Sequence, residues 1–470
     1  MKKVLLIVIV MAVISFAAVY YWQQTHITIG GVEYPLDLTE LDLFGQSVPY
    51  ARQLSRLTAL EHLDLRYTDI TPEDYSYLLK ALPSCDILWL VPFQGQHLSP
   101  ELEELTVTSL TDEEVALLAC FPRLRQLNGL YCQDLQQLLA AQAQYPHCAV
   151  TYRVPLDGDY YPWDATELCL AGPSFDALPD ALALLPRVEK IRIQEPVTDP
   201  EALLGFMEAY PQLELDFSLA LYGTTVTPDA TFLDFSGTPI GDLASLEAAL
   251  PLLPALTQVD MVDCGLSDEE MGALNSRWPN TLFVWEVSIG HFKLRTDITY
   301  FMPYQYRYVV SDKDADTLQY LTELICLDFG HMNITRTDYL AHMTKLQYLL
   351  ICDTPITDLS PCANLKDLKY AEFFMTDVTD YTPLLECPNL VDLNIGYTYP
   401  TDPLIFTQMP QLENLWFRGM YDEQIMAQLK DALPNTRMVF RGGSSTGAGW
   451  RDLPNYFAQR DILGMGYMTG

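Results

Sequence analysis

Apolar residues recur every 22 positions near the C-terminal end of the chain, and each copy begins with a leucine: Leu324, Leu346, Leu368, Leu390 and Leu412. In every copy, further apolar residues follow three and five positions later. This alternation predicts a short strand with one buried face. A fixed period of about 20–29 residues predicts a stack of such units, which is a solenoid.

The same pattern extends toward the N-terminus with less regular spacing. Its clearest copies begin at Leu60, Ala230 and Leu256, and weaker copies begin at Leu38, Leu102, Leu124, Ala165 and Val188. A second strand motif, led by proline and ending in an aromatic residue, recurs at spacings of 63, 65 and 68 residues. Its copies start at Pro83, Pro146, Pro211 and Pro279, and a glycine follows each of them. We therefore expect units of about 65 residues with three strands each, and a last copy at Pro434 is expected to close the sheet.

The segments between the strands predict two kinds of outer face. Stretches starting at Asp112, Pro200 and Asp268 have helical apolar spacing, and Thr111 is placed to cap the first of them. In the 22-residue repeats the return segment is shorter, as in residues 357–365, and has room for one helical or 3₁₀ turn. The outer face is therefore predicted to change from α-helices to tighter turns near residue 320.

These repeats resemble the leucine-rich repeat superfamily. Residues 324–422 are similar to the bacterial 22-residue class of internalin-like surface proteins, and the repeat signature covers roughly residues 36–440. The resemblance implies an α/β solenoid, a leucine-rich repeat horseshoe with a parallel concave β-sheet and short helices or turns on the convex side. The residues that replace the family's usual Asn are Met332, Thr354, Thr376 and Thr398.

The patterns divide the chain into five predicted segments. They are a signal anchor over residues 1–24, irregular repeats over 25–296, a junction over 297–323, regular repeats over 324–440, and a linker with a C-terminal tail or cap over 441–470. The linker is rich in Gly and Ser, which predicts flexibility. The tail is aromatic and is expected to pack back on the last repeat, because a terminal repeat leaves its core open on one side.

The N-terminus predicts a membrane anchor. Lys2 and Lys3 precede a run from Val4 to Trp22 that is 19 residues long and has no charge. Such a run is just long enough to span a bilayer, and lysines on its N-terminal side would leave the rest of the chain outside the cytoplasm. The predicted localisation is a single-pass protein of the cell membrane. The alternative is a cleaved signal peptide and a secreted protein.

Composition narrows the classes of partner. The net charge of −35 repels polyanions, so nucleic acid is not expected as a partner, and the membrane is expected to be contacted only through the anchor. An acidic coat also serves solubility, which is the simpler interpretation of the charge. A hydrophobic content of 49% excludes a mostly disordered chain.

The sequence predicts neither an enzyme nor a cofactor or metal site. It has no nucleophile elbow, no zinc-protease helix motif and no phosphate-binding glycine loop. Residues 312–323 imitate a calcium loop, but Thr317 stands where the sharp turn needs glycine. Ser311 and Asp312 are more simply the cap of a short helix. The cysteines fall at repeat positions that suit small buried residues, which disfavours a disulfide framework.

The concave strand positions of the regular repeats are the predicted binding surface. Alternate residues of a strand point to opposite faces, so one set lines the concave side. The predicted binding residues are Tyr348, Leu350, Tyr370, Phe374, Trp416 and Arg418, accompanied by Asp328, Glu372, Asp392 and Asn394. Grouped aromatic residues are typical of protein-binding surfaces, although solenoid strands also tolerate them for their β-propensity alone.

The corresponding positions nearer the N-terminus are mostly acidic. They are Asp42, Asp64, Asp234 and Asp260, interrupted by Arg66 and Arg192. They would steer a cationic ligand or simply form a solvated surface.

The predicted function is a membrane-anchored, extracytoplasmic leucine-rich repeat protein that binds a protein or peptide through its concave face. One alternative is a structural envelope spacer without a specific ligand. The other is an enzyme with a site in the irregular segments near residues 297–310 or 450–470.

Overall fold

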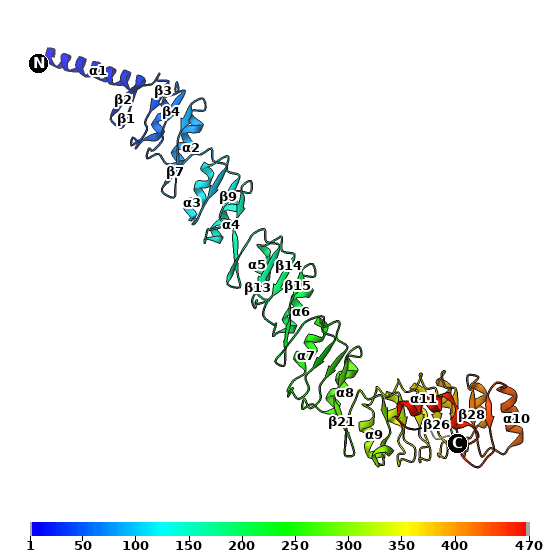
Figure 1. The fold of residues 1–470 in the computed structure, drawn as a ribbon. Coiled ribbons are helices and arrows are strands. Elements are labelled where there is room, and N and C mark those ends of the chain that lie inside the picture. The colour runs from blue at the N-terminus through cyan, green and yellow to red at the C-terminus, as the bar shows by residue number, and fades with distance from the viewer. Residues whose placement is uncertain (1, 467–470) are drawn as a thin grey trace. The chain divides into compact units, whose positions relative to one another are not determined.

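The computed structural model describes the backbone of residues 2–466 and divides into two compact units. The first comprises Met1–Glu195 and Gly205–Phe217, and the second comprises Pro196–Leu204 and Ser218–Gly470. Both are built from short parallel strands that alternate with helices or turns, as an α/β leucine-rich repeat solenoid requires (Figure 1). The predicted fold class is therefore confirmed.

The chain begins with helix α1 (Lys2–Thr25). Among the residues that the structure describes, no helix combines the length and the apolarity needed to cross a membrane. The predicted anchor and the single-pass localisation that followed from it are therefore wrong.

The first unit repeats one module, a β-hairpin followed by a sheet of three parallel strands. The hairpins are β1 (His26–Ile29) with β2 (Val32–Pro35), β6 (Val91–Phe93) with β7 (Gln96–Leu98), and β11 (Arg153–Leu156) with β12 (Asp159–Pro162). The sheets are β3 (Glu40–Asp42), β4 (His62–Asp64) and β5 (Asp86–Leu88); β8 (Glu104–Thr106), β9 (Gln126–Asn128) and β10 (Ala149–Thr151); and β13 (Glu167–Leu170), β14 (Lys190–Ile193) and β15 (Glu214–Asp216).

Helices and 3₁₀ turns connect the strands of the first unit. They are η1 (Ala51–Arg56), α2 (Pro72–Ala81), α3 (Asp112–Leu117), η2 (Leu118–Cys120), α4 (Leu135–Gln144) and α5 (Leu178–Ala183), and the division between the units crosses α6 (Pro200–Ala209). Thr111 caps α3, as predicted, in a capping box with Glu114.

The hairpins are the feature that the sequence did not reveal. In four of the five hairpins of the chain, the turn consists of two residues with positive φ, for example Asp157 at 53° and Gly158 at 84°. Such turns match the twist of paired strands, and glycine adopts this backbone without strain. The glycine after each proline-led strand thus marks a hairpin turn, and each of the four hairpins marked in this way follows the third strand of a parallel sheet.

The second unit opens with one more module and a further hairpin. Its elements are β16 (Leu219–Leu221) with β17 (Thr224–Val226), β18 (Phe232–Asp234), α7 (Ala244–Ala249), η3 (Leu250–Leu252), β19 (Gln258–Asp260), α8 (Asp268–Arg277), β20 (Leu282–Val284), and β21 (Glu286–Ile289) with β22 (Phe292–Arg295). From there, one parallel sheet of seven strands runs without interruption.

The seven strands of this sheet are β23 (Tyr300–Phe301), β24 (Cys326–Asp328), β25 (Tyr348–Leu350), β26 (Tyr370–Glu372), β27 (Asp392–Asn394), β28 (Asn414–Trp416) and β29 (Arg437–Val439). Strands β24 to β28 stack in the register that the 22-residue period predicts. Leu327, Leu349, Ala371, Leu393 and Leu415 are paired along the stack and fully buried. The last proline-led copy forms β29 at the edge of the sheet, as predicted.

The convex side of this sheet carries mainly 3₁₀ turns, which confirms the predicted change near residue 320. The elements are η4 (Pro303–Tyr306), η5 (Asp312–Asp314), α9 (Ala315–Leu318), η6 (Asp338–His342), η7 (Ser360–Asn364), η8 (Thr382–Glu386), η9 (Pro403–Gln408) and α10 (Glu423–Ala432). Thr354, Thr376 and Thr398 are buried, and each hydroxyl donates to the main-chain carbonyl three residues earlier. Threonine therefore supplies a bond of its own where the family has Asn.

Candidate functional site: a concave face covered by the C-terminal segment

The concave face of the seven-stranded sheet is the side opposite the convex turns. Every residue of β25, β26 and β27 is buried, although only alternate residues of each strand point into the core. A strand buried on both faces must be covered on its second side. The cover is the C-terminal segment, residues 441–466.

The C-terminal segment crosses the sheet as a short helix. After turn η10 (Trp450–Asp452), helix α11 (Pro454–Ile462) lies across the strands (Figure 1). The helix has nine residues, so at ~1.5 Å per residue it is long enough to cross about three strands that lie ~4.8 Å apart. With its flanking turns, the segment reaches farther along the seven-stranded sheet than the helix alone does.

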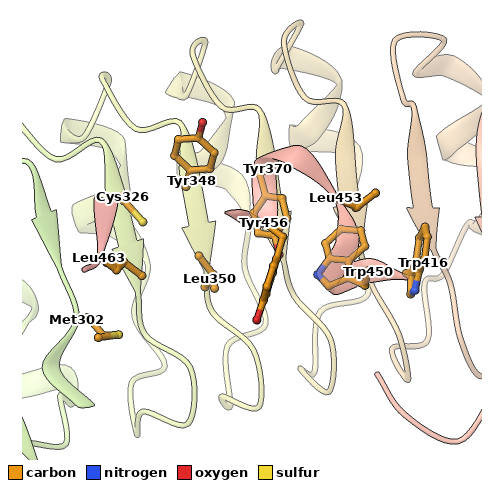
Figure 2. Packing of buried hydrophobic residues seen from close by; sticks show 10 residues of the cluster. All are labelled: Met302, Cys326, Tyr348, Leu350, Tyr370, Trp416, Trp450, Leu453, Tyr456 and Leu463. Carbon is orange, nitrogen blue, oxygen red and sulfur yellow. The ribbon is translucent and has the colours of Figure 1, made fainter. Parts of the chain in front are cut away.

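One face of the segment is apolar and packs on the strands. Trp450, Leu453, Tyr456 and Leu463 recur at helical spacing and are between 0% and 6% exposed. Figure 2 shows them spread along the row of strands, with Trp450 next to Trp416 and Leu463 toward Met302 and Cys326. The ring centroid of Trp450 lies 5.1 Å from that of Tyr370 and 5.2 Å from that of Trp416.

The Gly- and Ser-rich stretch before the helix is bound as well. Its main-chain carbonyls accept hydrogen bonds from four side chains of the sheet or its loops. The bonds are Tyr397 Oη to Gly442 O (2.8 Å), Asn394 Nδ2 to Ser445 O (3.1 Å), Trp416 Nε1 to Gly447 O (3.0 Å) and Arg437 Nη2 to Ala448 O (2.8 Å). Residues predicted to form a flexible linker are thus held in place through their backbone.

A carboxylate lies at the centre of this contact. Glu372 is 4% exposed, and its Oε1 accepts hydrogen bonds from Trp450 Nε1 at 2.8 Å and from the Tyr370 hydroxyl. Burial raises the pKa of Glu372 to about 7, because the charged form is desolvated, and the two hydrogen bonds offset only part of that effect.

Two further carboxylates face the segment. Asp392 accepts hydrogen bonds from Asn414 Nδ2 at 2.7 Å and from Asn455 Nδ2 of the segment at 2.9 Å. Asp328 accepts from the Gly330 amide at 2.9 Å. Desolvation raises the pKa of both aspartates. Among the described residues, none of the three carboxylates has an ion-pair partner.

The structure brings the predicted binding residues together and buries them. Tyr348, Leu350, Tyr370 and Trp416 belong to one apolar cluster with the C-terminal segment. Phe374 and Arg418 are 8% and 2% exposed, and Arg418 packs against Gly442 and Gly447 of the segment. Whether a foreign ligand uses these six residues stays a prediction.

The occupant of the face is what sequence reasoning missed. The tail was expected to pack on the last repeat, whereas it reaches from Trp416 in β28 back to Cys326 in β24. The available signal was the spacing of Trp450, Leu453 and Tyr456, which gives a helix of this size one apolar stripe.

The acidic concave positions nearer the N-terminus range from exposed to buried, and Asp64 and Asp260 pair with arginines. Arg66 Nη2 lies 2.6 Å from Asp64 Oδ2, and hydrogen bonding from Arg66 lowers the pKa of Asp64. Arg192 lies 2.9 Å from Glu167 and 3.2 Å from Asp216. In the second unit, Arg295 lies 2.9 Å from Asp260. Asp42 and Asp234 are exposed.

Residues 312–323, which resemble a calcium loop in sequence, begin with an aspartate that forms hydrogen bonds within the protein. Asp312 accepts bonds from Thr335 and from the Arg336 amide, and the Thr335 hydroxyl bond lowers its pKa. Ser311 forms a capping box with Asp314, as the cap interpretation predicted. Over the described residues, no group of three metal-ligating side chains comes together.

The parallel registers and the 22-residue stack have the architecture of a leucine-rich repeat solenoid. No protein-family model matches the chain, and no curated protein matches it. Among solved structures it is similar to bacterial internalin and leucine-rich repeat proteins. An internalin (InlF) of Listeria monocytogenes is 16% identical over 88% of this chain and 86% of that chain, with a TM-score of 0.23.

Two further solved structures are also similar to this chain. Internalin C2 of Listeria monocytogenes is 18% identical over 50% of this chain and 73% of its own, with a TM-score of 0.21. A leucine-rich repeat protein of Leptospira interrogans is 13% identical over 86% of this chain and 96% of its own, with a TM-score of 0.25.

Proposed function

We propose that this chain is a protein-binding leucine-rich repeat protein that holds an amphipathic peptide on the concave face of its seven-stranded sheet. The role is recognition and not catalysis. The observation that supports it best is the C-terminal segment itself, because that face already accommodates an irregular stretch followed by an amphipathic helix.

Two kinds of contact make the face suited to this role. Side-chain donors such as Asn394 and Arg437 bind main-chain carbonyls, which every peptide has. Buried aromatic residues such as Trp416 and Tyr370 then select for apolar side chains at helical spacing. Helices that present such a stripe to an apolar surface are a recurring mode of peptide recognition.

The proposal is tested by opening the intact chain at one bond. Gly443 is exposed and has no neighbour within 4 Å of its Cβ position, so a protease site inserted between Gly443 and Ser444 leaves the contacts intact. After cleavage, a fluorescent peptide of residues 444–466 is added, and its anisotropy reports entry onto the face.

We expect the labelled peptide to exchange with the cleaved segment. Its Trp450→Ala version should bind at least about tenfold more weakly, since truncating a buried aromatic residue costs on the order of 3 kcal/mol or more. Trp416→Ala in the protein should weaken the parent peptide similarly. No exchange under any condition would mean that the segment is a permanent cap, which favours the spacer interpretation.

A further inference from the structure

We propose, resting on the proposed function, that the ligand of this concave face is a basic amphipathic helix of a partner protein, which displaces the C-terminal segment. The inference starts from a mismatch between the face and its present occupant. The face has two buried carboxylates, in Glu372 and Asp392, and a half-buried one in Asp328, and the segment forms no ion pair with them among the described residues.

The donors that the segment does offer are neutral. Glu372 receives the indole N–H of Trp450, and Asp392 receives the side-chain amide of Asn455. A hydrogen bond from an ammonium or guanidinium group to a carboxylate is roughly twice as strong as one between neutral groups. The segment gives these carboxylates no counter-ion. A peptide with Lys or Arg at these places would therefore offset the free-energy cost of desolvating them.

The cations near the face form no ion pair with these carboxylates among the described residues. On the segment, Arg460 donates to Gly466 O and lies over the Tyr456 ring. Burial raises the pKa values of Asp328 and Glu372, and the charges of Arg460 and Arg451 offset that rise only in part. On the sheet, Arg437 lies over Trp416 at the β28 end, where Arg418 also packs against the segment's glycines. The carboxylates in the middle of the face are therefore left without an ion-pair partner among the described residues.

The contact also leaves polar atoms unsatisfied. Gln459 Oε1 on the segment and Arg418 Nε on the sheet are buried, and neither has a hydrogen-bond partner among the described residues. An unpaired buried polar atom costs about 1–3 kcal/mol. The segment is thus an imperfect occupant that a better-matched helix can replace, and the chain's net charge of −35 would speed the approach of a basic one.

The test uses the cleaved full-length chain and three peptides of residues 444–466. The first is the parent, the second carries Asn455→Lys, and the third carries the neutral control Asn455→Gln. At pH 7.5 we expect Asn455→Lys to bind about tenfold more tightly than the parent, because an ammonium group replaces the neutral amide as donor to the Asp392 carboxylate. The Asn455→Gln peptide should show no such gain.

A second set of measurements separates a specific pair from general attraction. The gain of the lysine peptide should disappear in protein carrying Asp392→Asn, which completes a double-mutant cycle. Were the gain to persist there, or to vanish entirely at 0.5 M salt while the cycle shows no coupling, the attraction would be non-specific and the inference overturned.

The remaining outcomes distinguish the two proposals. If the parent peptide binds but the lysine peptide gains nothing, the basic partner is excluded while the peptide-binding role stands. If no peptide binds, the proposed function itself fails. If the uncleaved chain forms dimers that the lysine peptide does not dissociate, measured by light scattering, the occupant is the segment of a second copy and the inference is overturned.

Discussion

The concave face has two contrasting regions in this molecule, although the same repeat motif builds both. In β3, β8 and β18 of the hairpin-separated modules, only the central residue of each strand is buried. In β25, β26 and β27 of the continuous sheet, all three residues are buried. The strand motif therefore decides which side chains face outward, and a cover decides whether those side chains meet water.

Sheet length explains why only one region is covered. A hairpin ends each sheet of the modules after three strands, which gives a surface only ~10 Å wide across the strands. The uninterrupted sheet has seven strands, and the nine-residue helix α11 with its flanking turns fits along it. Carboxylates differ accordingly: hydrogen bonding from Arg66 lowers the pKa of half-buried Asp64, whereas burial raises the pKa of Glu372.

The largest effect is expected from truncating equivalent aromatic residues in the two regions. Tyr370 and Phe232 both begin a strand, but Tyr370 is 0% exposed and Phe232 is 50% exposed. Tyr370→Ala should lower the free energy of unfolding by about 3 kcal/mol or more, because it leaves a cavity under the segment. Phe232→Ala should change it by less than about 0.5 kcal/mol. Chemical denaturation measures both, and equal losses would remove the distinction between the regions.

A pH effect should occur only in the covered region. The pKa of Glu372 rises from an ordinary 4.5 to about 7 on burial. Below about pH 4.5 the carboxyl is protonated whether or not the segment is docked. Between 4.5 and 7 only the undocked form ionises, so docking weakens as pH rises, by about 3 kcal/mol in total.

Glu372→Gln should therefore flatten this pH dependence and strengthen docking at pH 8. Hydrogen exchange of the α11 amides at pH 5 and pH 8, corrected for intrinsic rates, measures the difference. An unchanged slope in the variant would show that another group controls the docking.

A smaller effect is expected from the glycines that lead into the helix. Gly449 has φ of 88°, and a Cβ there would lie 2.6 Å from Arg437 Nη2. Gly449→Ala should weaken docking by about 1 kcal/mol, because alanine disfavours this backbone conformation. Gly443→Ala, at an open position, is the matched control. Proteolysis of the stretch at 443–449 measures both, and equal rates would contradict the bound path described for it.

The smallest effect is expected on the exposed face of the modules. Arg192 pairs with Glu167 and Asp216, and all three side chains are substantially exposed. Arg192→Ala should shift the free energy of unfolding by no more than about 1 kcal/mol, and less at high salt, because water and ions screen such pairs. A larger loss in thermal melts would mean that this face is organised for more than solvation.

Much of the fold could be read from the sequence because it depends on local repetition. The 22-residue period from Leu324 to Leu412 predicted the register, since stacked copies must superimpose their buried residues. The short return segments predicted 3₁₀ turns because no longer element fits. The hairpins were missed, although Asp157-Gly158 is a strong turn signal, because the repeat pattern was taken to run through them.

Only part of the candidate site could be predicted from the sequence. Strand alternation placed Tyr348, Tyr370 and Trp416 on one face, but it contained no information on what would lie over them. The same limit applies to Glu372, which is buried next to Trp450, a residue 78 positions later in the chain.

The sequence by itself thus determined the solenoid, its register and the direction of each strand side chain, because these follow from local periodicity and the two-residue alternation of strands. Only the tertiary structure decided which part of the concave face is open and which is filled. That choice depends on contacts between residues far apart in the chain, such as Trp450 with Glu372, and on the desolvation that those contacts impose.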